Sequence, residues 1–334
     1  EEDFWTALHE GKGRHGRLLY PAFPYTAYTH VKRADADAMY VYLRTLDPVH
    51  SVTHAPSLRF PFSLRTLLLA WRALYFDPGV FKPDPDKSAQ WNRGAYLVKG
   101  LGHCSACHTA RNVLGAQKSG QHLRGGLIPV EGWYAPGLGV ESDGSLAGWS
   151  ARDIHDLLKT GRSSRGTAYG PMADVVQGSL QYLDDKDLYA IADYLRSLPR
   201  RPSRSKPDDS ASGGPLSQEE VEALLAAGKR IFHRRCSACH QDHGQGVPHV
   251  YPKLAGNSVV MSPNPVNCVR VVMLGGFEPT TRTYPRPYSM PPFMQQLSDR
   301  QVAAVVSYIR QSWGNAAEAV SPQEVRKYRS IPLQ

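Results

Sequence analysis

The chain has 334 residues, a formal net charge of +9 at pH 7, 41% hydrophobic residues and 10% aromatic residues. This length allows two or three domains with separate cores, and the composition is that of a globular protein. No lysine- and arginine-rich cluster interleaved with aromatic residues is present, so the positive charge does not predict nucleic-acid binding.

The first 87 residues contain two predicted helices. RADADAMYVYLRTL, residues 33–46, has apolar residues at helical spacing and follows the loop LYPAFPYTAY, which contains Phe23. LRTLLLAWRALYF, residues 64–76, is too short for a membrane-spanning helix, which needs roughly 20 apolar residues. We favour a core helix for residues 64–76, with a helix lying in a membrane interface as the alternative. Because the sequence starts at Glu1 without a signal peptide, we expect that a segment upstream of it is missing.

Four of the five cysteines lie in two identical pentapeptides, CSACH at residues 104–108 and CSACH at residues 236–240. A structural zinc site would need a second close pair of ligands, and none follows at zinc-finger spacing. A redox dithiol would need a βαβ setting and would leave the histidine without a role. In a c-type haem anchor, both thiols form thioethers to the haem and the next residue ligates the iron. The pattern therefore predicts two haems, held by Cys104, Cys107 and His108 and by Cys236, Cys239 and His240. Cys268 has no partner motif and is predicted to be a small buried apolar residue.

A second axial ligand is predicted among the six methionines. Met172, in AYGPMADVV, and Met290, in YSMPPF, each lie beside a proline and ahead of a predicted helix, and methionine suits electron-transfer haems. Met294 is the reserve candidate, whereas Met273 is expected in the core. A ligating imidazole usually donates its other N–H group to a fixed acceptor, and we expect the carbonyl of Pro252 for one histidine and of Pro129 or Pro136 for the other.

The helices around the two motifs repeat. SQEEVEALLAAGKRIFHRRC opens with a predicted capping box, Ser217 with Glu220, and leads into the second motif. The closing helices 184–198 and 298–313 each end in a tyrosine, an aliphatic residue and an arginine, and helix 33–46 is a third copy. In that first copy, Phe23 stands where the methionine is expected. The proline- and serine-rich segment from Pro199 to Pro215 marks a domain boundary.

With these motifs, the chain resembles the multihaem cytochrome c subunits of bacterial membrane-bound dehydrogenases that oxidise alcohols, gluconate, fructose, sorbitol or aldehydes. The resemblance rests on LYPAFPYTAYT, WNRGAYLVKGLGHCSACHTARN, GWYAP, GPMADVV, QYL, MPPF and SYIRQSWGN, and it covers nearly the whole chain. It implies an all-α protein of tandem class I cytochrome c domains, two complete and one truncated at its N-terminus. The expected parts are an N-terminal unit (residues 1–50), a connecting segment (51–87), a middle unit (88–200), a linker (201–215) and a C-terminal unit (216–334).

The same resemblance implies that His108 and Met172 ligate one iron and that His240 and Met290 ligate the other. Trp133 and Tyr134 of GWYAP are expected beside a haem or facing a partner. Arg111 is expected either to neutralise a haem propionate or to be a solvated loop residue. Because the first CxxCH motif is absent and Phe23 replaces methionine, a third haem is expected only if an upstream segment supplies its anchor; the alternative is a degenerate unit that binds no haem.

The function implied is electron transfer. The subunit would accept electrons from a catalytic dehydrogenase subunit with a flavin, pyrroloquinoline quinone (PQQ) or molybdopterin cofactor and deliver them to ubiquinone or another respiratory acceptor. It would reside in the periplasm, attached peripherally to the outer face of the inner membrane, and would not itself be an enzyme. The alternatives are a dihaem enzyme of the peroxidase or thiosulfate dehydrogenase type, which needs an open iron, and a free-standing periplasmic electron shuttle.

Overall fold

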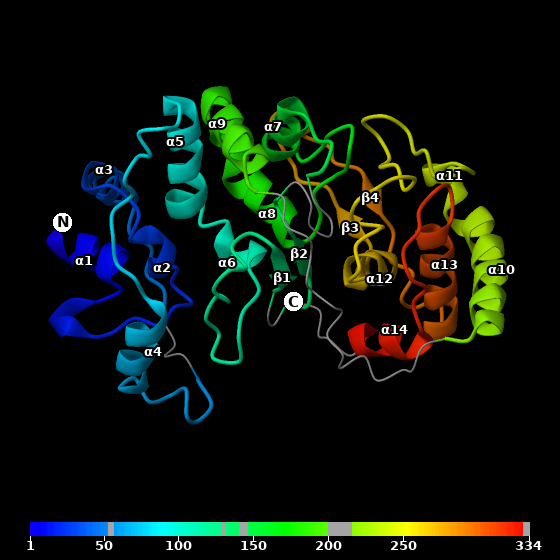
Figure 1. Ribbon diagram of the computed structural model, residues 1–334, viewed down its shortest axis with the longest axis horizontal. Coiled ribbons are helices and arrows are strands. Elements are labelled where there is room, and N and C mark those ends of the chain that lie inside the picture. The colour runs from blue at the N-terminus through cyan, green and yellow to red at the C-terminus, as the bar shows by residue number, and fades with distance from the viewer. Residues whose placement is uncertain (53–56, 129–130, 140–145, 200–215, 330–334) are drawn as a thin grey trace.

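The computed structural model describes residues 1–52, 57–128, 131–139, 146–199 and 216–329. The regular elements of these residues are helices apart from two short pairs of antiparallel strands, and the predicted units follow one another along the long axis (Figure 1). The N-terminal unit and connecting segment contain α1 (Glu2–Glu10), η1 (Arg14–Gly16), α2 (Tyr25–Tyr28), α3 (Arg33–Arg44) and α4 (Leu67–Tyr75).

The middle unit contains α5 (Ala89–Tyr96), a π-helical turn η2 (Leu97–Leu101), α6 (Ser105–His108), β1 (Gly125–Leu127), β2 (Tyr134–Pro136), α7 (Ala151–Thr160), α8 (Pro171–Gly178), η3 (Leu180–Tyr182) and α9 (Asp185–Arg196). The C-terminal unit contains α10 (Gln218–Arg235), α11 (Ser237–His240), α12 (Val266–Leu274), β3 (Gly276–Phe277), β4 (Ser289–Met290), α13 (Asp299–Gln311) and α14 (Pro322–Arg329). The predicted linker 201–215 lies outside the described residues.

The middle and C-terminal units are built around the same helix crossing. α5 packs against α9, and α10 packs against α13. At each crossing a glycine backbone meets an alanine backbone: a Cβ on Gly94 would overlap the carbonyl oxygen of Ala190, and a Cβ on Gly228 would overlap that of Ala304. These two alanines occupy matching positions in the closing helices, so the sequence repeat corresponds to a repeated three-dimensional contact.

The cores of the two units are separate clusters of apolar side chains. The middle unit buries Val98, Ile154 and Leu188, together with neighbours from α7 and α9. The C-terminal unit buries Phe232, Met273 and residues of α13, so the core assignment of Met273 is confirmed. The predicted capping box of Ser217 and Glu220 is present at the start of α10.

A third, smaller cluster joins the N-terminal unit to the middle unit. It buries Leu8, Val31 and Ala36, and Leu101 of the middle unit packs against it. Like α7 and α12, α1 ends at a glycine with positive φ, here Gly11. α3, the counterpart of α9 and α13, buries only Ala36 and leaves Val41, Tyr42 and Leu43 exposed.

The core interpretation of residues 64–76 is wrong. Among the residues of α4, only Leu68 is buried, whereas Leu67, Leu69 and Leu74 are 48%, 63% and 70% exposed. Polar contacts hold this segment in place: Arg65, two residues before α4, donates to the carbonyl of Leu18, and Trp71 of α4 donates to the carbonyl of Leu114 in the middle unit. No described helix is long and apolar enough to cross a membrane.

Candidate haem sites

The two CSACH segments fold alike. In each, the first cysteine precedes a single helical turn, α6 or α11, and its carbonyl accepts the backbone N–H of the histidine at 2.9 Å. Helical spacing of three and four residues places the second cysteine and the histidine on the same side as the first cysteine. One turn of chain can therefore offer two thiols and one imidazole to the same ligand.

Each motif histidine is oriented by a proline carbonyl. His108 Nδ1 lies 2.7 Å from the carbonyl oxygen of Pro136, and His240 Nδ1 lies 3.0 Å from that of Pro252. A carbonyl can only accept, so Nδ1 must carry the proton and Nε2 retains a lone pair for a metal. The structure thus confirms Pro252 and Pro136 as the acceptors; Pro129 lies outside the described residues.

Burial favours the neutral forms of the motif imidazoles and thiols. It lowers the pKa of His108 and His240, although the hydrogen bonds to the proline carbonyls oppose this. Burial also raises the pKa of Cys104 to about 12 and that of Cys236 to about 11. A reactive dithiol needs a lowered thiol pKa, so these cysteines do not fit the redox interpretation. Neutral imidazoles are the form that ligates iron.

The C-terminal motif opens into a cavity between the motif turn, the loop around Pro252 and the β3–β4 pair. Its lining includes Cys236, Cys239, His240 and Met290, so the structure brings the predicted methionine to the same cavity as the motif. Met290 belongs to β4 and pairs with Gly276 of β3. The donor set and the mostly apolar lining fit a covalently bound haem. The reserve candidate Met294 does not line this cavity, and its backbone N–H donates to the carbonyl of Met273 at 2.9 Å.

In the middle unit, Met172 is the second residue of α8, directly after Pro171, and packs against the middle-unit core. The loop before it fits closely against Trp133, because a Cβ on Gly170 would lie 2.9 Å from the indole ring. Gly170 has φ of +51°, so both its conformation and its surroundings require glycine. Trp133 is therefore next to the segment that carries Met172.

Trp133 and Tyr134 also face the C-terminal unit. The guanidinium of Arg270 on α12 lies 4.9 Å from the Trp133 ring. Tyr134 N–H donates to Asn267 Oδ1 at 2.9 Å, and Asn267 Nδ2 donates to the Tyr134 carbonyl at 2.7 Å. GWYAP thus forms part of the contact between the two units, a role that could not be read from either unit's sequence alone.

Arg111 is half-buried in the loop that follows the first motif. Its guanidinium donates to the carbonyl of Gly115 at 2.6 Å and to that of Ala106 at 2.9 Å. Arg111 therefore closes this loop onto α6. Cys268 is a free thiol packed beside the C-terminal core, and its Sγ lies 3.7 Å from the carbonyl of Val259.

Comparison with known proteins identifies the class of protein to which the chain belongs. Residues 225–313, which include the second motif, match the cytochrome c family. The chain is 44% identical over 310 residues to a nicotinate dehydrogenase subunit of Pseudomonas putida, covering 92% of this chain and 25% of that protein. It is 37% identical to the cytochrome c subunit of the quinone-type alcohol dehydrogenase of Gluconobacter oxydans, covering 98% of this chain and 70% of the relative. The gluconate 2-dehydrogenase cytochrome c subunit of Pantoea cypripedii is 34% identical over 98% of this chain and 76% of its own length.

The chain therefore belongs to the family of cytochrome c subunits of dehydrogenase complexes. Membership confirms the predicted family, covalently bound haem c and an electron-transfer role. It resolves the choice among zinc, a redox dithiol and haem in favour of haem. The chain spans only a quarter of the length of the nicotinate dehydrogenase relative.

Proposed function

We propose that this chain binds two haems c in two complete class I cytochrome c units. Cys104 and Cys107 would anchor the first haem, and Cys236 and Cys239 the second. The observation that carries this proposal is the repeat of one geometry: a motif turn, a histidine whose Nδ1 donates to a proline carbonyl, and a glycine-to-alanine helix crossing.

His108 with Met172, and His240 with Met290, are proposed as the axial ligands. A bound haem supplies a one-electron Fe(III)/Fe(II) couple, and a methionine ligand raises its reduction potential. The protein's own contribution is to hold each imidazole in one tautomer and to shield the site with apolar side chains. With a methionine proposed for each iron, this ligand set favours a relay over a peroxidase-type enzyme with an open iron.

The N-terminal unit is proposed to bind no haem with the residues of this sequence. It lacks a CxxCH motif, and Phe23, at the expected methionine position, is 37% exposed with its ring 5.5 Å from that of Tyr28. A third haem would require ligands from outside residues 1–334.

We infer that the chain passes electrons from a catalytic dehydrogenase subunit to ubiquinone or another respiratory acceptor. The names of the relatives support a dehydrogenase partner. Its cofactor, whether flavin, PQQ or molybdopterin, belongs to that partner. The proposed location is the periplasm, at the outer face of the inner membrane.

Peripheral membrane attachment is proposed through α4 and the loop before it. Phe60 is 79% exposed and Phe62 is 53% exposed, and residues 48–76 contain three arginines and no acidic residue. Exposed aromatic and leucine side chains beside basic residues are typical of segments that bind anionic lipid surfaces. We expect Phe60→Ser/Phe62→Ser to reduce binding of the haem-loaded protein to phosphatidylglycerol vesicles. Val113→Ser, which changes one apolar side chain at a 95% exposed site outside this segment, is the control and should leave vesicle binding unchanged. Unchanged vesicle binding in the phenylalanine variant would contradict this attachment.

The relay is tested by gentle purification of the native protein from membranes. Recovery with a large chain carrying a flavin, PQQ or molybdopterin would support the proposal and identify the substrate class. A haem protein recovered alone, with one ferrous iron that readily binds carbon monoxide, would support the dihaem enzyme instead. A solitary protein that does not bind carbon monoxide would favour the free-standing shuttle.

A further inference from the structure

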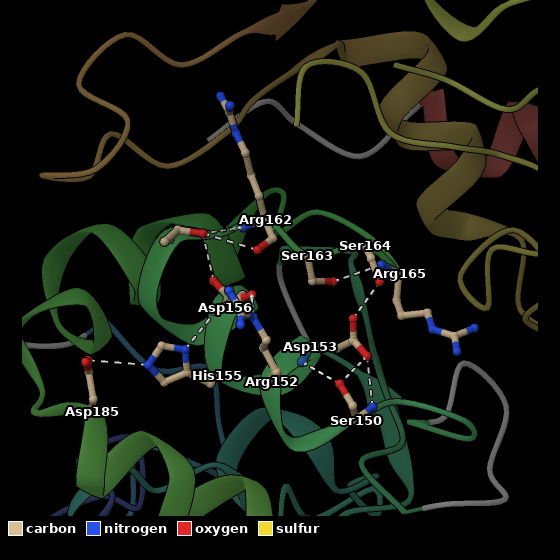
Figure 2. Close-up of polar contacts among 11 residues, drawn as sticks. Ser150, Arg152, Asp153, His155, Asp156, Arg162, Ser163, Ser164, Arg165 and Asp185 are labelled. Carbon is tan, nitrogen blue, oxygen red and sulfur yellow. Dashed lines mark hydrogen bonds and ion pairs between the residues drawn. The ribbon is translucent and has the colours of Figure 1, made fainter. Parts of the chain in front are cut away.

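The middle unit extends one loop into the C-terminal unit. α7 ends at Gly161, whose φ is +77°, and a Cβ there would overlap the ring of Pro279. Immediately after this close contact comes Arg162. Figure 2 shows that Arg162 points away from the polar cluster around Asp153 and Asp156 of α7, and that Arg165 points in a different direction.

Arg162 is buried against residues of the C-terminal unit. Its guanidinium forms an ion pair with Glu278, and both side chains are only 5% exposed. The same guanidinium donates to the carbonyl of His249 at 2.6 Å and lies 4.1 Å from the Tyr284 ring. Truncating either member of such a buried pair leaves the other charge without its partner in a poorly solvated place.

This ion pair adjoins the proposed second haem site. Glu278 lines the cavity that contains Cys236, Cys239, His240 and Met290. Tyr169, from the middle unit, lines the same cavity and lies close to Gly276, where a Cβ would be 3.3 Å from its ring. Burial raises the pKa of both Tyr169 and Glu278, as expected for groups removed from water. The cavity wall is therefore made by two units.

We infer that the middle unit completes the haem site of the C-terminal unit: Tyr169 closes the cavity wall, and Arg162 neutralises Glu278 beside the haem. This inference rests on the proposed binding of haem at His240. A carboxylate near the haem favours the ferric state and a cation favours the ferrous state, and such effects are strong where water is excluded. The cross-unit pair thus sets the reduction potential of one haem while it fixes the two units together.

The test is a redox titration of the full haem-loaded chain, with covalent haem counted beforehand. The His240 haem is assigned as the one whose potential moves in Met290→His. Glu278→Gln leaves Arg162 as an uncompensated cation and should raise this potential, whereas Arg162→Met leaves the carboxylate and should lower it. We expect each to change the ferrous-to-ferric ratio at fixed electrode potential by about tenfold, which for one electron is about 59 mV.

Further variants separate charge from structure. Arg162→Lys keeps the charge and should stay near the wild-type potential, and the double variant Arg162→Met/Glu278→Gln should return toward it. Arg165→Met is the matched control, because this arginine of the same loop is exposed and donates to the Gly148 carbonyl at 2.8 Å. If Arg162→Met does not fold, the inference is tested with Glu278→Gln against Arg162→Lys: only Glu278→Gln should raise the potential of the His240 haem, and equal potentials in the two variants would contradict the inference.

Shifts of the same sign in Glu278→Gln and Arg162→Met, or no shift in either with haem attached, would overturn the inference and leave the two-haem proposal intact. Absence of haem at His240 in the wild-type chain would overturn the proposed function itself. Opposite shifts confined to the His240 haem would support a site completed by the neighbouring unit.

Discussion

The crossing of α10 and α13 allows a sharp test of the fold. A Cβ on Gly228 would overlap the carbonyl oxygen of Ala304 and would lie 2.7 Å from both the carbonyl carbon of Ala304 and Cβ of Tyr308. Two of these atoms are backbone, so no rotamer change can relieve the contact and the helices must move apart. We therefore expect Gly228→Ala to destabilise the C-terminal unit.

The magnitude follows from two opposing effects. Overpacking in a closely packed core costs typically about 1–3 kcal/mol, and here the bundle that surrounds Phe232 and Ala304 would have to shift. Replacing a helical glycine by alanine contributes about 1 kcal/mol of stabilisation in the absence of steric conflict. Because the contact is with backbone atoms, we expect a steric cost in the upper part of this range, about 2–3 kcal/mol, and therefore a net loss of about 1–2 kcal/mol.

The assay is denaturant unfolding of the haem-loaded chain, followed by far-UV circular dichroism and haem absorbance. Gly178→Ala is the matched control, because Gly178 ends α8 and has no atom within 4 Å of its Cβ position. The stability of the Gly178→Ala variant should be unchanged or slightly increased. Equal effects of Gly228→Ala and Gly178→Ala would refute the argument from the helix crossing.

Three further predictions concern the ligands, a surface ion pair and the middle-unit crossing. Met172→His and Met290→His should each lower the reduction potential of a different haem by roughly 0.1 V or more; Met261→Ala, at a 38% exposed site, should change neither in the same redox titration. Arg93 pairs with Asp187 at 2.7 Å and lowers the pKa of that carboxyl, so the pair stabilises the fold above the ordinary value of 3.8 and this contribution is lost as the pH falls through the lowered pKa. Arg93→Gln should therefore cost up to about 1 kcal/mol at about pH 6 and less as the pH approaches about 3, and a penalty independent of pH would contradict the assignment. Gly94→Ala should destabilise the middle unit as Gly228→Ala does the C-terminal unit, and full stability in urea unfolding would argue against the shared crossing.

Local patterns in the sequence predicted much of the fold and the chemistry of the sites. The closing helices were predicted from apolar spacing, and the start of α10 from its capping box. The proline carbonyl acceptors were predicted because a ligating imidazole needs a fixed acceptor and few candidates follow each motif. The axial roles of Met172 and Met290 stay predictions, although Met290 does line the cavity with His240.

What the sequence did not predict depends on contacts between distant segments. Helical spacing in residues 64–76 indicated an apolar face but not whether another element covers it, and in α4 most of that face is exposed. Arg162 and Glu278 are far apart in the chain and carry no motif, so their pairing appears only when the units are placed together. The same holds for Asn267 and the Tyr134 backbone.

The central claim, two haems covalently held by one chain, is tested most directly by the intact mass of the purified protein and by mass spectrometry of its CSACH peptides. We expect two haems per chain, one on the peptide with Cys104 and Cys107 and one on the peptide with Cys236 and Cys239. A single haem, or unmodified cysteines in either peptide of protein matured in a host with active haem attachment, would contradict it.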